Sequence, residues 1–136
     1  MLDLDMIDHE KGLRSQRQSA MKERTKNFAR LTVLACRRAA PTQDGRHLSG
    51  QLIRSSTSVA ANYRAACRAR SKKEFLAKIG IVLEEADESL FWLEFGQDTG
   101  VLSADSAVPL CKEANELVAI FTAARNTASR NLTSKP

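Results

Sequence analysis

Aromatic residues make up only 5% of this 136-residue chain, and no run of alternating β-branched residues lies between turn-forming pairs. Both features are typical of strands, so their absence argues against a sandwich or a barrel. The chain is instead rich in Ala, Leu, Arg, Lys and Glu, and 43% of its residues are hydrophobic. This composition favours a helical globular protein with a single domain.

Two further absences limit the cellular setting. The cysteines, Cys36, Cys67 and Cys111, lie far apart without a C-x-x-C pair, so neither a disulfide framework nor a zinc site is expected. The first residues, MLDLDMIDHEKG, are acidic and lack the basic start and apolar run of a signal peptide. No stretch has the length of a membrane span. We therefore expect a cytoplasmic protein that does not bind membranes.

Charge is distributed unevenly, although the whole chain carries a net charge of only +5. Residues 17–78 contain 15 basic and 3 acidic residues, a net charge of +12. Residues 79–136 contain 4 basic and 9 acidic residues, a net charge of −5, and residues 1–16 carry −2. This separation indicates either an anionic partner for the first part or attraction between the two parts.

Turn-forming residues divide the chain into four amphipathic stretches. We predict helices over about residues 17–38, 48–68 and 71–98, and a fourth that begins near Ser103 or Ser106 and continues to about residue 130. Ser71 and Glu74 form an S-x-x-E capping box at the start of the third helix, and Gly100 is placed to end it. Pro109 is tolerated in or near the first turn of the fourth helix.

Four amphipathic helices with short links predict an all-α, antiparallel up-and-down four-helix bundle over residues 17–130. Residues 1–16 and 131–136 are expected to be a flexible extension and a flexible tail. Apolar side chains at steps of three and four residues mark the core face of each helix. The predicted core residues are Phe28, Leu31, Ala35, Leu48, Leu52, Val59, Tyr63, Ala66, Phe75, Ile79, Val82, Leu83, Ala86, Leu90, Leu93, Leu110, Ala114, Leu117, Phe121 and Ala124.

The second and third helices each carry a second distinctive face. On the second helix this face is small and polar, and on the third it combines apolar and acidic residues. A helix with two packing faces needs two neighbours, so we predict a homo-oligomer over the alternative of ordinary surface. The predicted interface residues are Arg54, Ser58, Asn62, Ile81, Glu85, Glu88, Trp92 and Phe95. Arg54 is expected to pair with Glu85 or Glu88, within or between subunits.

Basic residues gather where the second helix gives way to the third. The predicted nucleic-acid-binding residues are Arg64, Arg68, Arg70, Lys72, Lys73 and Lys78. Such a cluster binds the phosphates of RNA or DNA by charge, and its binding is sensitive to salt. No aromatic residue is interleaved for base stacking, so little sequence specificity is expected. The alternatives are a solvated surface or cations that pair with the acidic second part.

No pattern typical of catalysis or of a metal or cofactor site is present. The acidic run of residues 84–88 lacks the Glu-x-x-His pairs of a di-iron bundle, and the only histidines are His9 and His47. Neither a phosphate-binding P-loop nor a G-x-G-x-x-G motif occurs. We expect a non-enzymatic protein with no catalytic residue, no metal and no cofactor.

Residues 51–94 carry two specific motifs, Q-L-x-R-S-x-x-S-V-x-x-N and S-K-x-E-F followed by L-x-x-A-x-E-S-x-x-W-L-E. They closely resemble a bacterial family of four-helix bundles named for proteins encoded in intervening sequences of 23S rRNA genes. The resemblance implies a ring-like or barrel-like homopentamer. The family resembles the accessory variability determinant of diversity-generating retroelements, a basic pentamer that binds a reverse transcriptase and nucleic acid.

The chain also departs from the family pattern. Many members have N-I-x-E-G where this chain has Asn62-Tyr63-Arg64-Ala65-Ala66, so no role of that glutamate carries over. Many members begin near the position of Met21, so residues 1–20 are either an extension or a start placed too early.

The sequence predicts a homopentameric scaffold that binds RNA or DNA electrostatically, with a reverse transcriptase or other protein as a further partner. The alternative is a protein-interaction adaptor that does not bind nucleic acid. Salt-dependent binding of RNA or DNA distinguishes the two.

Overall fold

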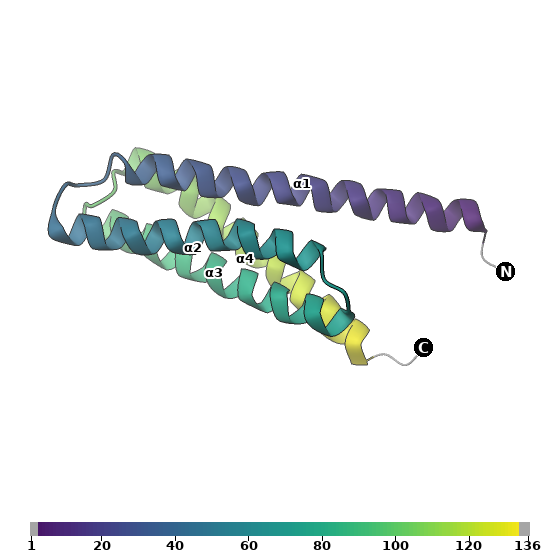
Figure 1. The fold of residues 1–136 in the computed structure, drawn as a ribbon. Coiled ribbons are helices and arrows are strands. Elements are labelled where there is room, and N and C mark those ends of the chain that lie inside the picture. The colour runs from purple at the N-terminus through teal and green to yellow at the C-terminus, as the bar shows by residue number, and fades with distance from the viewer. Residues whose placement is uncertain (1–2, 134–136) are drawn as a thin grey trace.

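The computed structural model describes residues 3–133, which form four long helices. They are α1 (Leu4–Cys36), α2 (Gln43–Cys67), α3 (Lys72–Asp98) and α4 (Ala104–Thr133). Successive helices run in opposite directions, and α4 returns to pack against α1 (Figure 1). The predicted all-α, up-and-down four-helix bundle is therefore confirmed. None of the helices within residues 3–133 has an apolar stretch that would span a bilayer.

The ends of α3 follow the predicted signals. The Ser71 hydroxyl accepts a hydrogen bond from the Glu74 backbone N–H at 3.0 Å, as the capping box requires. The Glu74 carboxylate accepts from the backbone N–H of Arg70 at 3.3 Å, one residue further back than in the usual box. At the other end Gly100 has a φ of +77°, a left-handed conformation that favours glycine. Val101 then turns inward and is buried.

Three helix boundaries differ from the prediction by three residues or more. Residues 4–16 continue α1 as helix, where we expected loose chain, and residues 131–133 continue α4. α2 begins at Gln43, before the predicted residue 48, because the Thr42 hydroxyl caps it by accepting from the Gly45 N–H at 3.1 Å. Residues 1, 2 and 134–136, also expected to be flexible, lie outside the described residues.

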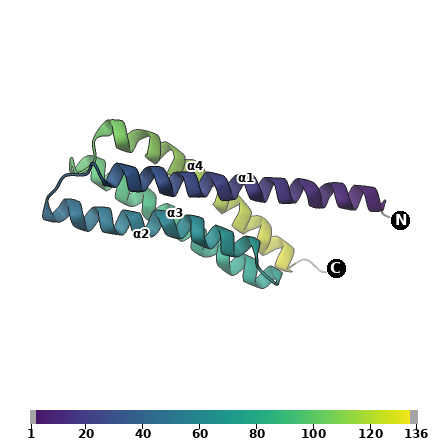
Figure 2. The ribbon, with the colours of Figure 1, turned by 45° about the horizontal axis from the view of Figure 1, so that its top comes forward.

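The N-terminal part of α1 projects from the bundle. It extends past the ends of the other three helices in both views (Figures 1 and 2). Its start is capped by the Asp3 carboxylate, which accepts from the Asp5 backbone N–H at 3.0 Å. Helix propagation needs no tertiary contact once a neighbouring turn is formed, so the core-packed part of α1 nucleates the rest.

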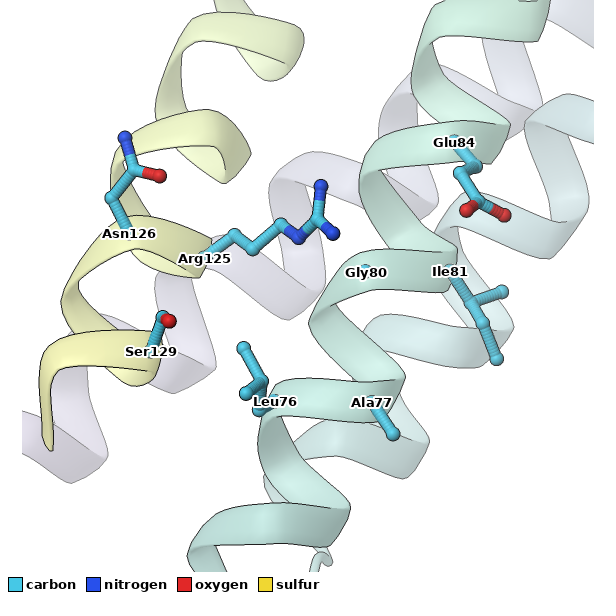
Figure 3. Close-up of a pocket in the computed structure, with 8 residues that line it drawn as sticks. All are labelled: Leu76, Ala77, Gly80, Ile81, Glu84, Arg125, Asn126 and Ser129. Carbon is cyan, nitrogen blue, oxygen red and sulfur yellow. The ribbon is translucent and has the colours of Figure 1, made fainter. Parts of the chain in front are cut away.

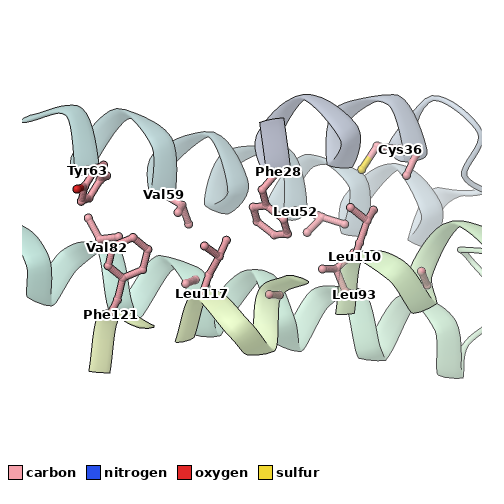
Figure 4. Close-up of a cluster of buried hydrophobic side chains, with 14 of the residues drawn as sticks. Phe28, Cys36, Leu52, Val59, Tyr63, Val82, Leu93, Leu110, Leu117 and Phe121 are labelled. Carbon is pink, nitrogen blue, oxygen red and sulfur yellow. The ribbon is translucent and has the colours of Figure 1, made fainter. Parts of the chain in front are cut away.

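The core lies along the axis of the bundle between all four helices (Figure 4). Its largest fully buried apolar side chains are Phe28, Leu52, Val59, Ile79, Val82, Leu93, Leu117 and Phe121. The prediction that Leu31 belongs to the core was wrong, because Leu31 is 41% exposed. The buried line of α1 steps from Phe28 to Thr32 and Ala35, four residues on and then three, and so passes Leu31 by.

Gly45 allows the chain to turn tightly into α2, and Gly50 provides a matched control. A Cβ at residue 45 would lie 2.0 Å from the Ala40 carbonyl oxygen, whereas a Cβ at residue 50 would meet nothing within 4 Å. We predict that Gly45→Ala lowers the free energy of unfolding by about 2 kcal/mol or more. Gly50→Ala should raise it by about 0.5–1 kcal/mol, because alanine favours the helix. Urea unfolding followed by circular dichroism measures both, and equal stabilities would contradict the close approach at Gly45.

Candidate interaction surfaces

Small side chains bring α2 and α3 together. The hydroxyl oxygens of Ser55 and Ser89 lie 2.9 Å apart, and both residues are fully buried. The Ser89 hydroxyl also lies 2.8 Å from the backbone carbonyl oxygen of Glu85, within its own helix. Two serines at a helix crossing leave room for close packing while satisfying each other's hydrogen bonds. Ser55 of α2 therefore packs against α3 of the same chain.

Arg54 holds the solvent-facing edge of this crossing. Its Nη1 donates to the Glu85 carboxylate at 3.0 Å, and its Nη2 donates to the Glu88 carboxylate. The Trp92 indole N–H donates to the same Glu88 carboxylate at 3.2 Å. The pairing that the sequence predicted for Arg54 therefore forms within one chain.

Ser58 and Asn62 lie on the same side of α2 as Arg54 and Ser55. Both are half-buried, and the Asn62 side-chain amide donates to the Ser58 backbone carbonyl at 2.9 Å. At about 100° per residue they fall between Arg54 and Ser55 around the helix. These two candidates for a subunit interface therefore share the side of α2 that carries Arg54 and Ser55.

The outer face of α3 carries an exposed aromatic patch, which we define as Phe91 and Phe95. They are 53% and 45% exposed, and their rings stack with centroids 5.7 Å apart and planes at 9°. Trp92 is half-buried and meets Phe91, Phe95 and His47 edge-on. Ile81, 38% exposed, lies on the same face nearly three turns away.

Sequence reasoning missed Phe91 and placed Trp92 on the outer face instead. The spacing of four residues between Phe91 and Phe95 was the available signal, because such residues share a helix face. Trp92 lies about 100° further round and turns toward α2.

One end of the bundle carries a group of exposed cations, the basic end. It consists of Arg64, Arg68, Arg70, Lys72 and Lys73, all exposed, from the last turn of α2, the link and the first turn of α3. Within residues 3–133 its one ion pair joins Arg70 Nε to a Glu74 carboxylate oxygen at 3.7 Å, and the Arg70 side chain is 91% exposed. Lys78, the sixth predicted residue, is half-buried further along α3.

A groove of about 970 Å³ opens beside the basic end, where α1 diverges from α4 (Figure 2). Apolar and aromatic residues of α2, α3 and α4 line it, namely Tyr63, Phe75, Ile79, Ile120 and Phe121. Its cations are Arg14, Arg17, Arg70 and Lys72. The sequence did not link Arg14 and Arg17 to the residues near position 70, because only the fold brings α1 beside the α2–α3 link.

A smaller notch of about 510 Å³ lies between α3 and α4 (Figure 3). Arg125 extends from α4 toward α3 over Gly80, which has no side chain to fill the space. Glu84 lines the same notch, so it offers both a cation and a carboxylate. The balanced charge favours neither an anionic nor a cationic ligand.

Cys36 and Cys111 are not activated for nucleophilic chemistry. Burial raises the pKa of Cys36, and burial together with the nearby Glu94 and Asp98 raises the pKa of Cys111. A raised pKa disfavours the thiolate, which is the reactive form. Residues 3–133 contain no cluster of three or more His, Cys, Asp or Glu side chains that could hold a metal ion.

An ion network ties α1 to α4. Arg24 donates to both Glu113 carboxylate oxygens, from Nε at 2.9 Å and from Nη2 at 2.6 Å. Nη2 also donates to Glu116 at 2.8 Å. The hydrogen bond from Arg24 lowers the pKa of Glu113. Arg54 with its two glutamates makes the same kind of contact. In both networks an arginine of the basic part, residues 17–78, binds glutamates of the acidic part, residues 79–136.

Comparisons with known proteins agree with this fold. Residues 17–123 match a family model described as "23S rRNA-intervening sequence protein". A solved structure from Bacteroides thetaiotaomicron, a protein of unknown function from the S23 ribosomal protein family, superimposes with a TM-score of 0.70 at 28% identity. The alignment covers 76% of this chain and 96% of that one. A search among curated proteins found no match.

The Arg24 network makes stability depend on pH. A carboxylate whose pKa is lowered by folding stabilises the native state above its unfolded pKa, and this contribution is lost as the pH falls. We predict that Glu113→Gln lowers the free energy of unfolding at pH 7 by about 1 kcal/mol. The difference from wild type should shrink between about pH 5 and pH 3.

Glu116→Gln serves as the matched control, because Glu116 makes one bond to Arg24 and its side chain is 51% exposed. Glu116→Gln should lower the free energy of unfolding by less than Glu113→Gln does at every pH. Urea unfolding at a series of pH values measures both variants. A loss for Glu113→Gln that does not change with pH would contradict the stabilising role of the ionised carboxylate.

Proposed function

This chain belongs to the family of 23S rRNA-intervening sequence proteins, and on that premise we propose that it is a non-enzymatic, homo-oligomeric scaffold that binds RNA or DNA by charge. The observation that carries the proposal is the contrast between two kinds of cation. Arg24 and Arg54 each form ion pairs with two glutamates of the same chain. The cations of the basic end remain exposed at one end of the molecule.

Exposed cations that outnumber the nearby carboxylates attract phosphate groups. When such a cation binds a phosphate, the counterions that the phosphate holds are released. Tyr63 and Phe75 line the neighbouring groove, where Tyr63 is buried and Phe75 is half-buried, so neither offers a fully exposed ring for base stacking. The proposed binding therefore depends on backbone phosphates, has little sequence specificity and weakens steeply with salt.

We assign subunit association to the outer face of α3. Phe91 and Phe95 form an exposed apolar surface, and burying such a surface against another subunit removes it from water. The family resemblance suggests five copies in a ring. Rotational symmetry would then repeat the basic end around the assembly and multiply its phosphate contacts.

The basic end provides the main test of nucleic-acid binding. The variant Arg68→Gln, Arg70→Gln, Lys72→Gln, Lys73→Gln should weaken binding to single-stranded RNA and DNA by about 100-fold or more in low salt. The slope of log Kd against log salt should fall by about 3 if four phosphate contacts are lost. Fluorescence anisotropy with labelled oligonucleotides at several salt concentrations measures both quantities.

The matched control removes four exposed cations at the other end of the bundle, at Arg37, Arg38, Arg46 and Lys112. It has the same net charge as the first variant and should retain most of the affinity. Equal losses in the two variants would show that net charge alone is responsible. If the wild-type protein binds no nucleic acid in low salt, the proposed nucleic-acid scaffold is ruled out in favour of a protein-interaction adaptor.

The aromatic patch provides the test of association. Phe91→Ser with Phe95→Ser should reduce the mass of the assembly measured by light scattering, while the helical content stays unchanged. The control, Leu31→Ser with Ile53→Ser, alters two residues that are 41% and 36% exposed on α1 and α2. It should leave the mass unchanged. An unchanged mass in the Phe91 and Phe95 variant would rule out this face as the subunit contact.

A further inference from the structure

The side of α1 that faces the core continues into the projecting helix as one line of side chains. In the projecting helix most side chains of this line are charged. At alternating steps of four and three residues it runs through Asp3, Ile7, Glu10, Arg14, Arg17 and Met21. From Met21, a second step of four residues and one of three lead through Thr25 to the buried Phe28. Inside the bundle this line packs on the core. In residues 3–13, about 16 Å of helix, it lies beyond the ends of the other helices (Figures 1 and 2).

The outer part of this helix combines exposed apolar and acidic side chains. Leu4 is 75% exposed and Met6 is 58% exposed, which is unusual for large apolar residues of a folded chain. The acids of this segment are Asp3, Asp5, Asp8 and Glu10. Residues 11–17 carry the opposite charge, with Lys11, Arg14 and Arg17.

The groove beside the basic end has the complementary surface. Apolar and aromatic residues of α2, α3 and α4 line it, and Arg14 and Arg17 of α1 add positive charge to the same lining. An acidic segment with apolar side chains therefore matches it in both charge and polarity. The segment of the same α1 cannot reach it, because a straight helix carries residues 3–13 away from its own groove.

We propose that residues 3–13 of one copy dock in the groove of a second copy, with the two α1 helices antiparallel about a twofold axis. In this register Asp3 and Glu10 of each copy lie near Arg17 and Arg14 of the other, and Ile7 enters the groove. A twofold axis uses the same pairing twice, so one sequence supplies both halves of the interface.

This contact is separate from the one assigned to α3. It uses residues of α1 and the groove, whereas the aromatic patch lies on the outer face of α3. Arg64, Arg68 and Lys73 of the basic end do not line the groove and remain free for phosphates. The two contacts together would join two ring-like assemblies through their α1 helices.

Charge exchange tests the contact in a background that carries Phe91→Ser and Phe95→Ser, so that association through α3 does not contribute. One variant carries Glu10→Lys, and the other carries Arg14→Glu. Each variant alone should show a dimer Kd at least about tenfold higher than the background protein in sedimentation equilibrium at low salt. An equimolar mixture should restore the dimer, because the introduced lysine of one chain would then meet the introduced glutamate of the other. The second site of that mixed dimer keeps its native pairs.

The matched control is Glu23→Lys, which makes the same charge change as Glu10→Lys on the other side of α1. It should dimerise like the background protein, and circular dichroism should show equal helical content in all variants. A monomeric background protein at high micromolar concentration overturns the proposal. So does a mixture that fails to associate, or a control that loses as much affinity as the two variants. None of these outcomes bears on nucleic-acid binding by the basic end.

Discussion

The close crossing of α2 and α3 is the constraint on which the surfaces of this protein depend. Ser55 and Ser89 meet at its centre, and their small size lets the two helices approach while each hydroxyl finds a hydrogen-bond partner. Arg54 closes the outer edge by binding Glu85 and Glu88. Two helices held this closely need only a short link, and the link brings the cations at the end of α2 beside those at the start of α3.

The same crossing fixes the rotation of α3 about its own axis. With Ser89 turned toward α2 and Leu93 in the core, the side that remains faces solvent. Phe91 and Phe95 lie on that side and stack on each other because they are one turn apart. The exposed aromatic patch is thus a consequence of how the inner faces are arranged.

Cations serve two purposes in this chain. Arg24 and Arg54 each bridge two carboxylates of the acidic second part and hold helices together. A bidentate arginine–carboxylate pair has defined geometry and contributes more than a single exposed pair. The cations of the basic end and groove lie where the bundle offers few carboxylates, so their charge is directed at other molecules. Net charge alone would not distinguish these purposes.

The sequence by itself determined the four helices, the bundle, nearly all of the core and the acids that pair with Arg54, because helical periodicity and capping are local properties. It could not place Leu31 outside, turn Phe91 rather than Trp92 to solvent, or extend α1 back to Leu4. Periodicity gives the angle of a side chain about its own helix, whereas the neighbouring helices decide which angles are covered. Only the tertiary structure decided that Arg54 pairs within the chain and that α1 and α4 diverge into a basic groove, because both depend on contacts between distant segments.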